Sequence, residues 1–325
     1  TTDFIQSIIM SVALIVVLIF GVETAGGIGA VIHNASELPG YLSMTLSYDV
    51  NTGKAAPYSA LTIVSTAAWG LGYFGMPHIL LRFMAIEDEK KLKLSRRVAT
   101  IWVVISLFVA VFIGVIGYTM SKVGALETLT GSNSETIIVK ISALLSQHGV
   151  IFALLAGVIL AGILASTMST SDSQLLAASS AVSSDILGAF RKDSSNKNGS
   201  MAAARITLLV ISVVAAFIAR NPGSSVFAIV SFAWAGFGAA FGPVVLFSLF
   251  WKRTNKWGAL AGMICGGCMV FIWKYLVRPL GGIWNIYELL PAFLIACAAI
   301  VIVSLLTPKP SKEIEEEFDR VAQMK

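Results

Sequence analysis

Four hydroxyl side chains near the end of an apolar stretch have the spacing of one helix face. They occupy positions i, i+3, i+4 and i+7 of the stretch: Ser166, Ser169, Thr170 and Ser173. Residues at this spacing share one side of an α-helix. Hydroxyl and carbonyl oxygens are hard ligands, and several of them together suit a small alkali cation. The alternative, which the spacing leaves open, is that the hydroxyls bond back to the helix or across a helix contact.

Two carboxylates lie close to apolar stretches. Asp172 adjoins the hydroxyl face, and Asp3 stands at the start of the first stretch. A carboxylate at the centre of a membrane helix costs about 2.5–3.5 kcal/mol, so such residues usually face a cavity or a partner. The alternative is a helix cap near the interface. That alternative suits Asp3, but it does not suit Asp172 if its helix continues beyond it.

The segment 69–77 places three glycines and a proline inside an apolar stretch. It matches G-x-G-x-x-G formally, but a dinucleotide site needs a preceding strand, and none is predicted here. The composition instead predicts an interrupted membrane helix, whose freed backbone groups must line a cavity or be buried in protein. Trp69 and Tyr73, four residues apart, are candidates for a wall of that cavity. An aromatic belt or close helix packing is the alternative.

These residues need a bundle of membrane helices to position them. Only 13% of the 325 residues are charged and the mean hydropathy is +0.83, which excludes an ordinary soluble domain. A helix that spans the bilayer needs about 20 apolar residues. Eight such spans are predicted: 4–23, 58–77, 98–121, 150–170, 204–219, 226–250, 257–277 and 286–306. The fourth is expected to continue as a helix to about residue 190, and a short amphipathic helix is expected over 135–145.

The loops between these spans fix an orientation. Most Lys and Arg residues lie in alternate loops, which places those loops and both chain ends in the cytoplasm. We expect a transmembrane domain over 1–307 and a solvated cytoplasmic tail over 308–325. The short basic clusters do not form the continuous basic face of a nucleic-acid-binding protein. Cys265 and Cys268 are interpreted as small helix-packing residues rather than metal ligands, and small residues in span 226–250 indicate close packing or a hinge.

Three segments carry a resemblance to a known family: 69–84, 168–176 and 232–247. In these motifs, and along essentially its whole length, the chain resembles the sodium/solute symporter family. The resemblance implies an all-α integral membrane protein with a LeuT-like inverted repeat of five plus five core helices and about thirteen spans. The chain would then be the C-terminal eight spans, incomplete at the N-terminus, an expectation that its start without Met also supports.

The resemblance also implies roles for individual residues. Sodium would be bound by the backbone carbonyl of Ser166 and by the hydroxyls of Ser169 and Thr170. A candidate second cation site would be formed by Asp3, Asp172 and Ser173. The substrate side of the cavity would be formed by Trp69, Tyr73 and Pro77. Met76 replaces a glutamine that is common in relatives of this kind, so the family is better indicated than the substrate.

The function implied is secondary active transport: symport of L-proline with sodium into the cell by alternating access, in a bacterial inner membrane. The expected partners are sodium, proline or a similar small solute, and the lipid bilayer. No cofactor, other metal, nucleic acid or obligate protein partner is expected, and no constellation of catalytic residues indicates an enzyme. Two alternatives are a sodium symporter for another amino acid, organic acid or sugar, and the membrane domain of a sensor protein. A sensor would need a long cytoplasmic region after the last span.

Overall fold

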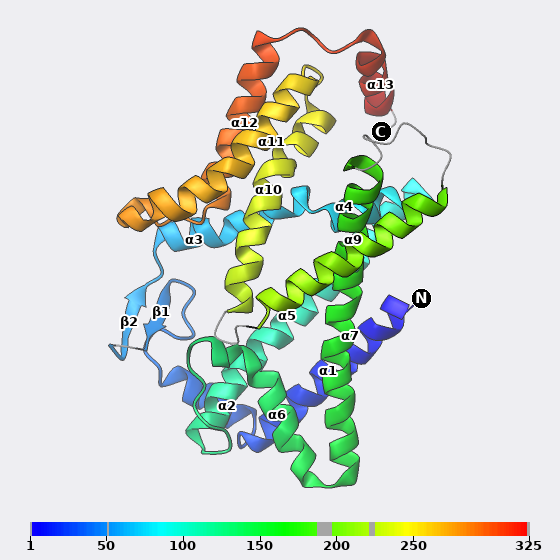
Figure 1. The fold of residues 1–325 in the computed structure, drawn as a ribbon. Helices are drawn as coiled ribbons and strands as arrows, with labels where there is room; N and C mark the ends of the chain where they lie inside the picture. Colours follow the sequence, from blue (N-terminus) through cyan, green and yellow to red (C-terminus); the bar gives the residue numbers. More distant parts are fainter. Residues whose placement is uncertain (1, 51, 187–196, 221–224, 324–325) are drawn as a thin grey trace. The chain divides into compact units, whose positions relative to one another are not determined.

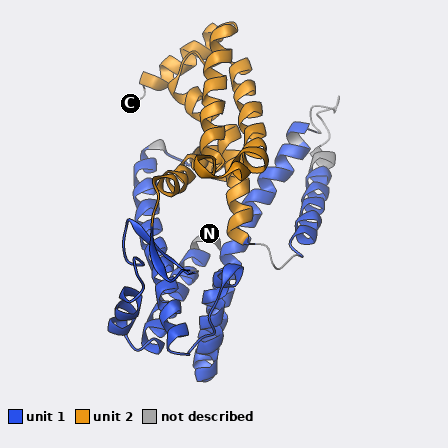
Figure 2. Ribbon diagram, turned by 90° about the vertical axis from the view of Figure 1, so that its left-hand side faces the viewer, with its two compact units in different colours: residues 1–56, 86–225 blue, residues 57–85, 226–325 orange. Residues whose placement is uncertain are grey.

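The computed structural model describes residues 2–50, 52–186, 197–220 and 225–323, which are mostly helical (Figure 1). The molecule consists of two compact units, residues 1–56 with 86–225 and residues 57–85 with 226–325 (Figure 2). The longer helices are α1 (Thr2–Thr24), α5 (Leu92–Lys122), α7 (Val150–Ser180), α9 (Lys197–Ile218), α10 (Val226–Phe250), α11 (Lys256–Ile272) and α12 (Leu289–Leu306).

Seven helices of the described residues are long and apolar enough to cross a membrane. They match seven of the predicted spans: Ile5–Thr24, Leu92–Lys122, Val150–Ser183, Met201–Ile218, Val226–Phe250, Lys256–Leu280 and Leu289–Leu306. The eighth predicted span, 58–77, is interrupted. It is divided into α3 (Ala60–Ala67), the 3-10 helix η1 (Ala68–Gly75) and α4 (Pro77–Met84). The interruption was itself predicted from the glycines and proline of this segment.

The spans expose much of their apolar surface. Side chains such as Phe108, Leu154 and Phe217 stand on the outside of their helices, and each is at least two-fifths exposed. A soluble protein rarely exposes so large an apolar area, whereas a membrane helix presents such residues to lipid tails. The burial pattern therefore agrees with the membrane assignment that the composition indicated.

The first unit is built around α1, α5, α7 and the short helix α6 (Ile137–Leu145). Its buried core is aliphatic and includes Val17, Ile113, Ile116 and Ile159. The prediction of a short helix near 135–145 is confirmed by α6. The predicted continuation of α7 is confirmed as far as Ile186, through the π-helix η5 (Ala181–Ile186), and its last part lies outside the described residues.

A hairpin and two ion pairs organise the loops of this unit. The segment 24–56 contains α2 (Ile28–Ser36) and a two-stranded sheet of β1 (Leu46–Asp49) and β2 (Lys54–Pro57). Lys122 at the end of α5 pairs with Glu37 just after α2, and this ammonium lowers the pKa of the Glu37 carboxyl. Lys140 on α6 pairs with Glu127 at 2.6 Å. Both pairs are exposed, so they fix the loop geometry more than they stabilise the fold.

The second unit packs α10, α11 and α12 side by side. Its buried core contains Ala235, Ala239, Val270, Leu289 and Phe293. The close approach depends on a row of glycines on α11 at four-residue spacing: Gly258, Gly262 and Gly266. A Cβ atom on each would meet α10 or α12 at 2.4 Å or less. Small residues at this spacing are typical of helix contacts in membranes, as predicted for the stretch that holds Cys265 and Cys268.

The chain end, expected to be a solvated tail, is a mostly exposed helix. Residues Lys312–Gln323 form the helix α13. Its Asp319 carboxylate forms an ion pair at 2.5 Å with the ammonium of Lys252, which lies in the turn between α10 and α11. Asn255 in the same turn donates to the Pro308 carbonyl at 2.7 Å and caps the start of α11. Charge content alone did not reveal this helix, because its contacts come from a turn more than 50 residues earlier.

The neighbouring glycines 266 and 267 provide a matched test of this packing. A Cβ at Gly266 would lie 2.2 Å from the Ala239 carbonyl oxygen, whereas one at Gly267 would make an ordinary 3.9 Å contact with Ala240. We expect Gly266→Ala to destabilise the protein by about 1–3 kcal/mol, because backbone atoms must move. Gly267→Ala should be neutral or stabilising, since alanine favours helix. Thermal unfolding in detergent measures both, and equal midpoints would contradict the packing described here.

Candidate functional site

The interrupted segment is the most unusual element of the second unit. After η1 the chain extends at Met76 (φ −84°, ψ 113°), and α4 begins at Pro77. Proline lacks an N–H and its ring blocks the preceding turn, so it begins a helix but does not continue one. The Met76 carbonyl accepts the N–H groups of Ile79 and Leu80, both at 3.0 Å. Other backbone groups around the break lose the partners that a continuous helix would supply.

Glycines seat this segment directly against α10. A Cβ at Gly72 would lie 1.9 Å from the Trp234 indole nitrogen, and a Cβ at Gly75 would lie 2.3 Å from the Phe237 carbonyl oxygen. The contact is reciprocal, because a Cβ at Gly238 would lie 2.7 Å from Cα of Gly72. Backbone thus packs on backbone with no side chain between. This contact buries much of the irregular backbone in protein, as a membrane environment demands.

An aromatic cluster covers the same contact. The Trp69 ring stacks near Phe227 and Trp234, each at 5.5 Å between centroids, and near Tyr287 at 6.0 Å. The Trp234 indole N–H donates to the Trp69 carbonyl at 3.0 Å, which satisfies one of the freed backbone groups. Tyr73 meets Trp234 edge-on at 4.8 Å and is half exposed. Trp69 and Tyr73 are therefore brought together around Trp234.

Two hydrogen bonds hold Tyr287 in this cluster. Its N–H donates to Ser65 Oγ at 3.1 Å, and its hydroxyl donates to the Ser231 carbonyl at 2.6 Å. The next residue, Glu288, is 1% exposed and pairs with Arg278 at 2.8 Å. A buried carboxylate without a cation would be strongly destabilising, so this pair fixes the start of α12. Sequence reasoning missed Tyr287 and Glu288, whose partners are as many as 222 residues away.

The predicted sodium residues lie on α7 in the first unit. Ser166 and Ser169 are half-buried and Thr170 is exposed. Within the described part of the chain, the hydroxyls of these three residues make no hydrogen bond. Ser173 instead donates its hydroxyl to the Ser169 carbonyl at 3.0 Å. Back-bonding to the helix, the alternative raised by the spacing, is thus observed at Ser173 and not at the other three.

The residues of the candidate second cation site are only partly described. Asp172 is exposed on α7, and Ser173, the next residue, is half-buried. Successive residues of a helix point about 100° apart, so these two side chains leave α7 in different directions. The backbone of Asp3 lies in α1, but its side chain lies outside the described residues. Among the described residues no group of three His, Cys, Asp or Glu side chains could hold a metal ion.

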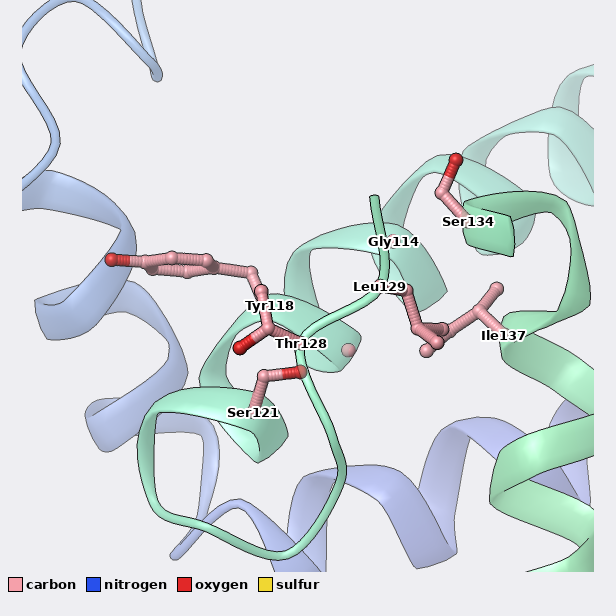
Figure 3. Close-up of a pocket in the computed structure, with 8 residues that line it drawn as sticks. Gly114, Tyr118, Ser121, Thr128, Leu129, Ser134 and Ile137 are labelled. Carbon is pink, nitrogen blue, oxygen red and sulfur yellow. The ribbon is translucent and has the colours of Figure 1, made fainter. Parts of the chain in front are cut away.

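One pocket of about 190 Å³ lies in the first unit, and none of the predicted site residues lines it (Figure 3). It is formed by the end of α5 and the chain that follows, and it is lined by Gly114, Gly117, Tyr118, Ser121, Thr128, Leu129, Ser134 and Ile137. Two of its hydroxyls are already donated: Ser121 to the Glu127 carbonyl and Ser134 to the Gly131 carbonyl. The hydroxyls of Tyr118 and Thr128 line the same space.

The glycine contact generates a test with its own control. Gly72→Ala should push the Trp234 ring away, lower the thermal midpoint by the equivalent of about 1–3 kcal/mol, and shift tryptophan emission, because overpacking forces rings and backbone apart. Gly70→Ala adds the same methyl group two residues earlier, where a Cβ meets nothing within 4 Å. Thermal unfolding followed by tryptophan fluorescence compares the two variants. Similar behaviour of both would mean that Gly72 does not set this contact.

Comparison with known proteins extends these observations along the chain. Residues 1–266 match the model of the Sodium:solute symporter family. The osmoregulated proline transporter OpuE of Bacillus subtilis is 38% identical over 312 residues, 96% of this chain and 59% of that protein. A sodium/proline symporter of Haemophilus influenzae is 42% identical over 262 residues, 80% of this chain and 51% of that protein. The high-affinity proline transporter PutP of Bacillus subtilis is 38% identical over 320 residues, 98% of this chain and 63% of that protein.

The chain therefore spans between 51% and 63% of the length of these relatives. The similarity nevertheless runs through α1, α5, α7 and the interrupted segment, and it agrees with a multi-pass helical membrane protein. Because the family match covers residues 1–266 without depending on any single motif, the chain belongs to the sodium:solute symporter family, whose members are transporters rather than enzymes.

Proposed function

We propose that the complete protein is a sodium-coupled symporter that carries L-proline, or a closely similar small solute, into the cell. The observation that carries the proposal is that the hydroxyls of Ser166, Ser169 and Thr170 on α7 make no hydrogen bond within the described residues, in a chain of the sodium:solute symporter family. The relatives named as proline transporters or sodium/proline symporters support proline as the first substrate to test.

Sodium would be bound on α7 by neutral oxygens. The hydroxyls of Ser169 and Thr170 are available because no hydrogen bond within the described residues uses them. The carbonyl of Ser166 lies within α7, but a carbonyl oxygen has two lone pairs and can accept an ion beside its helix bond. Asp3, Asp172 and Ser173 would form a second cation site toward the cytoplasm, where the exposed Asp172 attracts an ion leaving the first.

The interrupted segment would provide the substrate side. The faces of Trp69 and Tyr73 offer apolar surface for a small ring, and the break at Met76 offers backbone groups for its polar end. Pro77 begins α4, and the start of a helix carries partial positive charge that suits a carboxylate. Trp69, Tyr73 and Pro77 would thus contact different parts of one amphiphilic solute.

The proposed fold is a LeuT-like inverted repeat that needs further spans before α1. The two described units would be parts of one transmembrane domain over 1–307, with residues 308–325 and both ends in the cytoplasm of a bacterial cell. Transport would follow alternating access, and linkage requires sodium and substrate to raise each other's affinity by the same factor. One sodium entering across 100 mV provides about 2.3 kcal/mol, enough for roughly a fiftyfold solute gradient.

Uptake of labelled proline into liposomes tests the coupling. The complete protein should accumulate proline when sodium is high outside, and a sodium ionophore should abolish the accumulation, because the gradient supplies the free energy. Equal uptake with and without the gradient contradicts the proposal. Competition by unlabelled amino acids, organic acids and sugars then distinguishes proline from another solute.

The hydroxyl face generates a second test. Ser169→Ala and Thr170→Ala should each raise the sodium concentration for half-maximal uptake about tenfold, the effect of losing about 1.4 kcal/mol of ligand energy. Thr167→Ala is the matched control, because its hydroxyl is already donated to the Ile163 carbonyl at 3.0 Å. An unchanged sodium dependence in both test variants would remove these hydroxyls from the site.

A further inference from the structure

Gln6 on α1 carries a polar atom that the bundle leaves without a partner. Its side-chain oxygen Oε1 is fully buried and, within the described residues, has no hydrogen-bond partner. An amide oxygen in this state loses its hydration and gains nothing in exchange, so folding alone does not account for it. Gln6 is not among the residues to which the sodium or substrate site has been assigned.

Two contacts show how α1 runs against α7. Phe20, near the end of α1, meets the ring of His148 just before α7 at 5.3 Å. Farther back on α1, Ile9 and Ala13 lie 3.5 and 3.7 Å from the Cβ position of Gly162. As the residue number falls along α1 it rises along α7, so the helices are antiparallel, which Figure 1 also shows. Each residue advances both helices by about 1.5 Å.

The same register brings Gln6 to the hydroxyl face. Gln6 precedes Ile9, Met10 and Ala13 by three, four and seven residues, so it lies on the side of α1 that contacts Gly162. On α7, Ser166 and Ser169 follow Gly162 by four and seven residues and lie on its side of the helix. Continuing the antiparallel register by one to two turns of α7 reaches these two serines, and it places the buried amide oxygen at about their depth.

We propose that Gln6 supplies its side-chain oxygen, from α1, to the sodium ion that binds the hydroxyl face of α7. An amide oxygen is a neutral hard ligand of the same kind as a carbonyl. A sodium ion between the helices would satisfy Oε1 and would join α1 to α7. The proposal rests on the proposed sodium-coupled function and adds to it a ligand on a second helix, so that sodium binding acts on the packing of the pair.

The effect of a Gln6 substitution on thermal stability, measured with and without sodium, distinguishes a sodium ligand from a purely structural residue. If Gln6 only filled space, Gln6→Leu would remove an unsatisfied polar atom and stabilise the protein equally with or without sodium. If Gln6 binds sodium, the same change should stabilise the sodium-free protein but weaken the further stabilisation that sodium provides. Thermal unfolding in sodium chloride and in choline chloride at equal ionic strength distinguishes the two.

The experiment compares three variants of the complete protein: Gln6→Leu, Ser169→Ala and Ser11→Ala. Ser11 is the control on α1, since its hydroxyl is already donated to the Ser7 carbonyl at 2.5 Å. We expect Gln6→Leu and Ser169→Ala to raise the sodium concentration for half-maximal stabilisation about tenfold, and Ser11→Ala to leave it unchanged. Where Gln6→Leu does not fold, Gln6→Glu should lower that concentration, because it keeps the oxygen and adds charge.

The outcomes separate this proposal from the function on which it rests. A shift in Ser169→Ala with none in Gln6→Leu or Gln6→Glu overturns the role of Gln6 and leaves the sodium site on α7 in place. No shift in any of these variants overturns the sodium site on α7 and the role of Gln6 together.

Discussion

The direct contact between glycines of η1 and glycines of α10 is the constraint on which the second unit depends. A membrane segment that stops being a regular helix frees backbone groups, and lipid cannot hydrogen-bond to them. Because Gly72 and Gly238 have no side chains, the two backbones can lie directly against each other, at positions where a side chain would clash. The Trp234 indole then covers the contact and donates to the Trp69 carbonyl. An irregular segment therefore persists at membrane depth without losing all of its hydrogen bonds.

The rest of that unit supports this contact from a distance. α11 brings its row of glycines against α10 and α12, so the three helices pack closely enough to form a wall behind the broken segment. At the start of α12, the buried Glu288 and its partner Arg278 hold Tyr287 where its ring meets Trp69. Helix packing, a buried ion pair and an aromatic cluster thus act on the same few residues. A change in any of them is therefore expected to shift the position of the Trp69 ring.

The first unit uses the opposite arrangement. α7 is continuous through its hydroxyl face, so its backbone bonds are internal and its polar chemistry lies in side chains. The absence of side-chain hydrogen bonds at Ser166, Ser169 and Thr170 within the described residues leaves oxygen lone pairs for a cation. On α1 the buried side-chain oxygen of Gln6 also has no hydrogen-bond partner among the described residues.

The sequence by itself determined the elements that local chemistry controls. Seven apolar spans, the break before Pro77, the short helix near residue 140 and the shared face of the α7 hydroxyls all follow from spacing and residue type. Only the tertiary structure decided what these elements contact: that Trp234 covers Gly72, that Glu288 is buried beside Arg278, and that the buried Gln6 oxygen has no hydrogen-bond partner among the described residues. The hairpin β1–β2 and the helix α13 also escaped prediction. Periodicity reports which face of a helix is polar or small, but the partner of that face lies far along the chain and depends on how the helices pack.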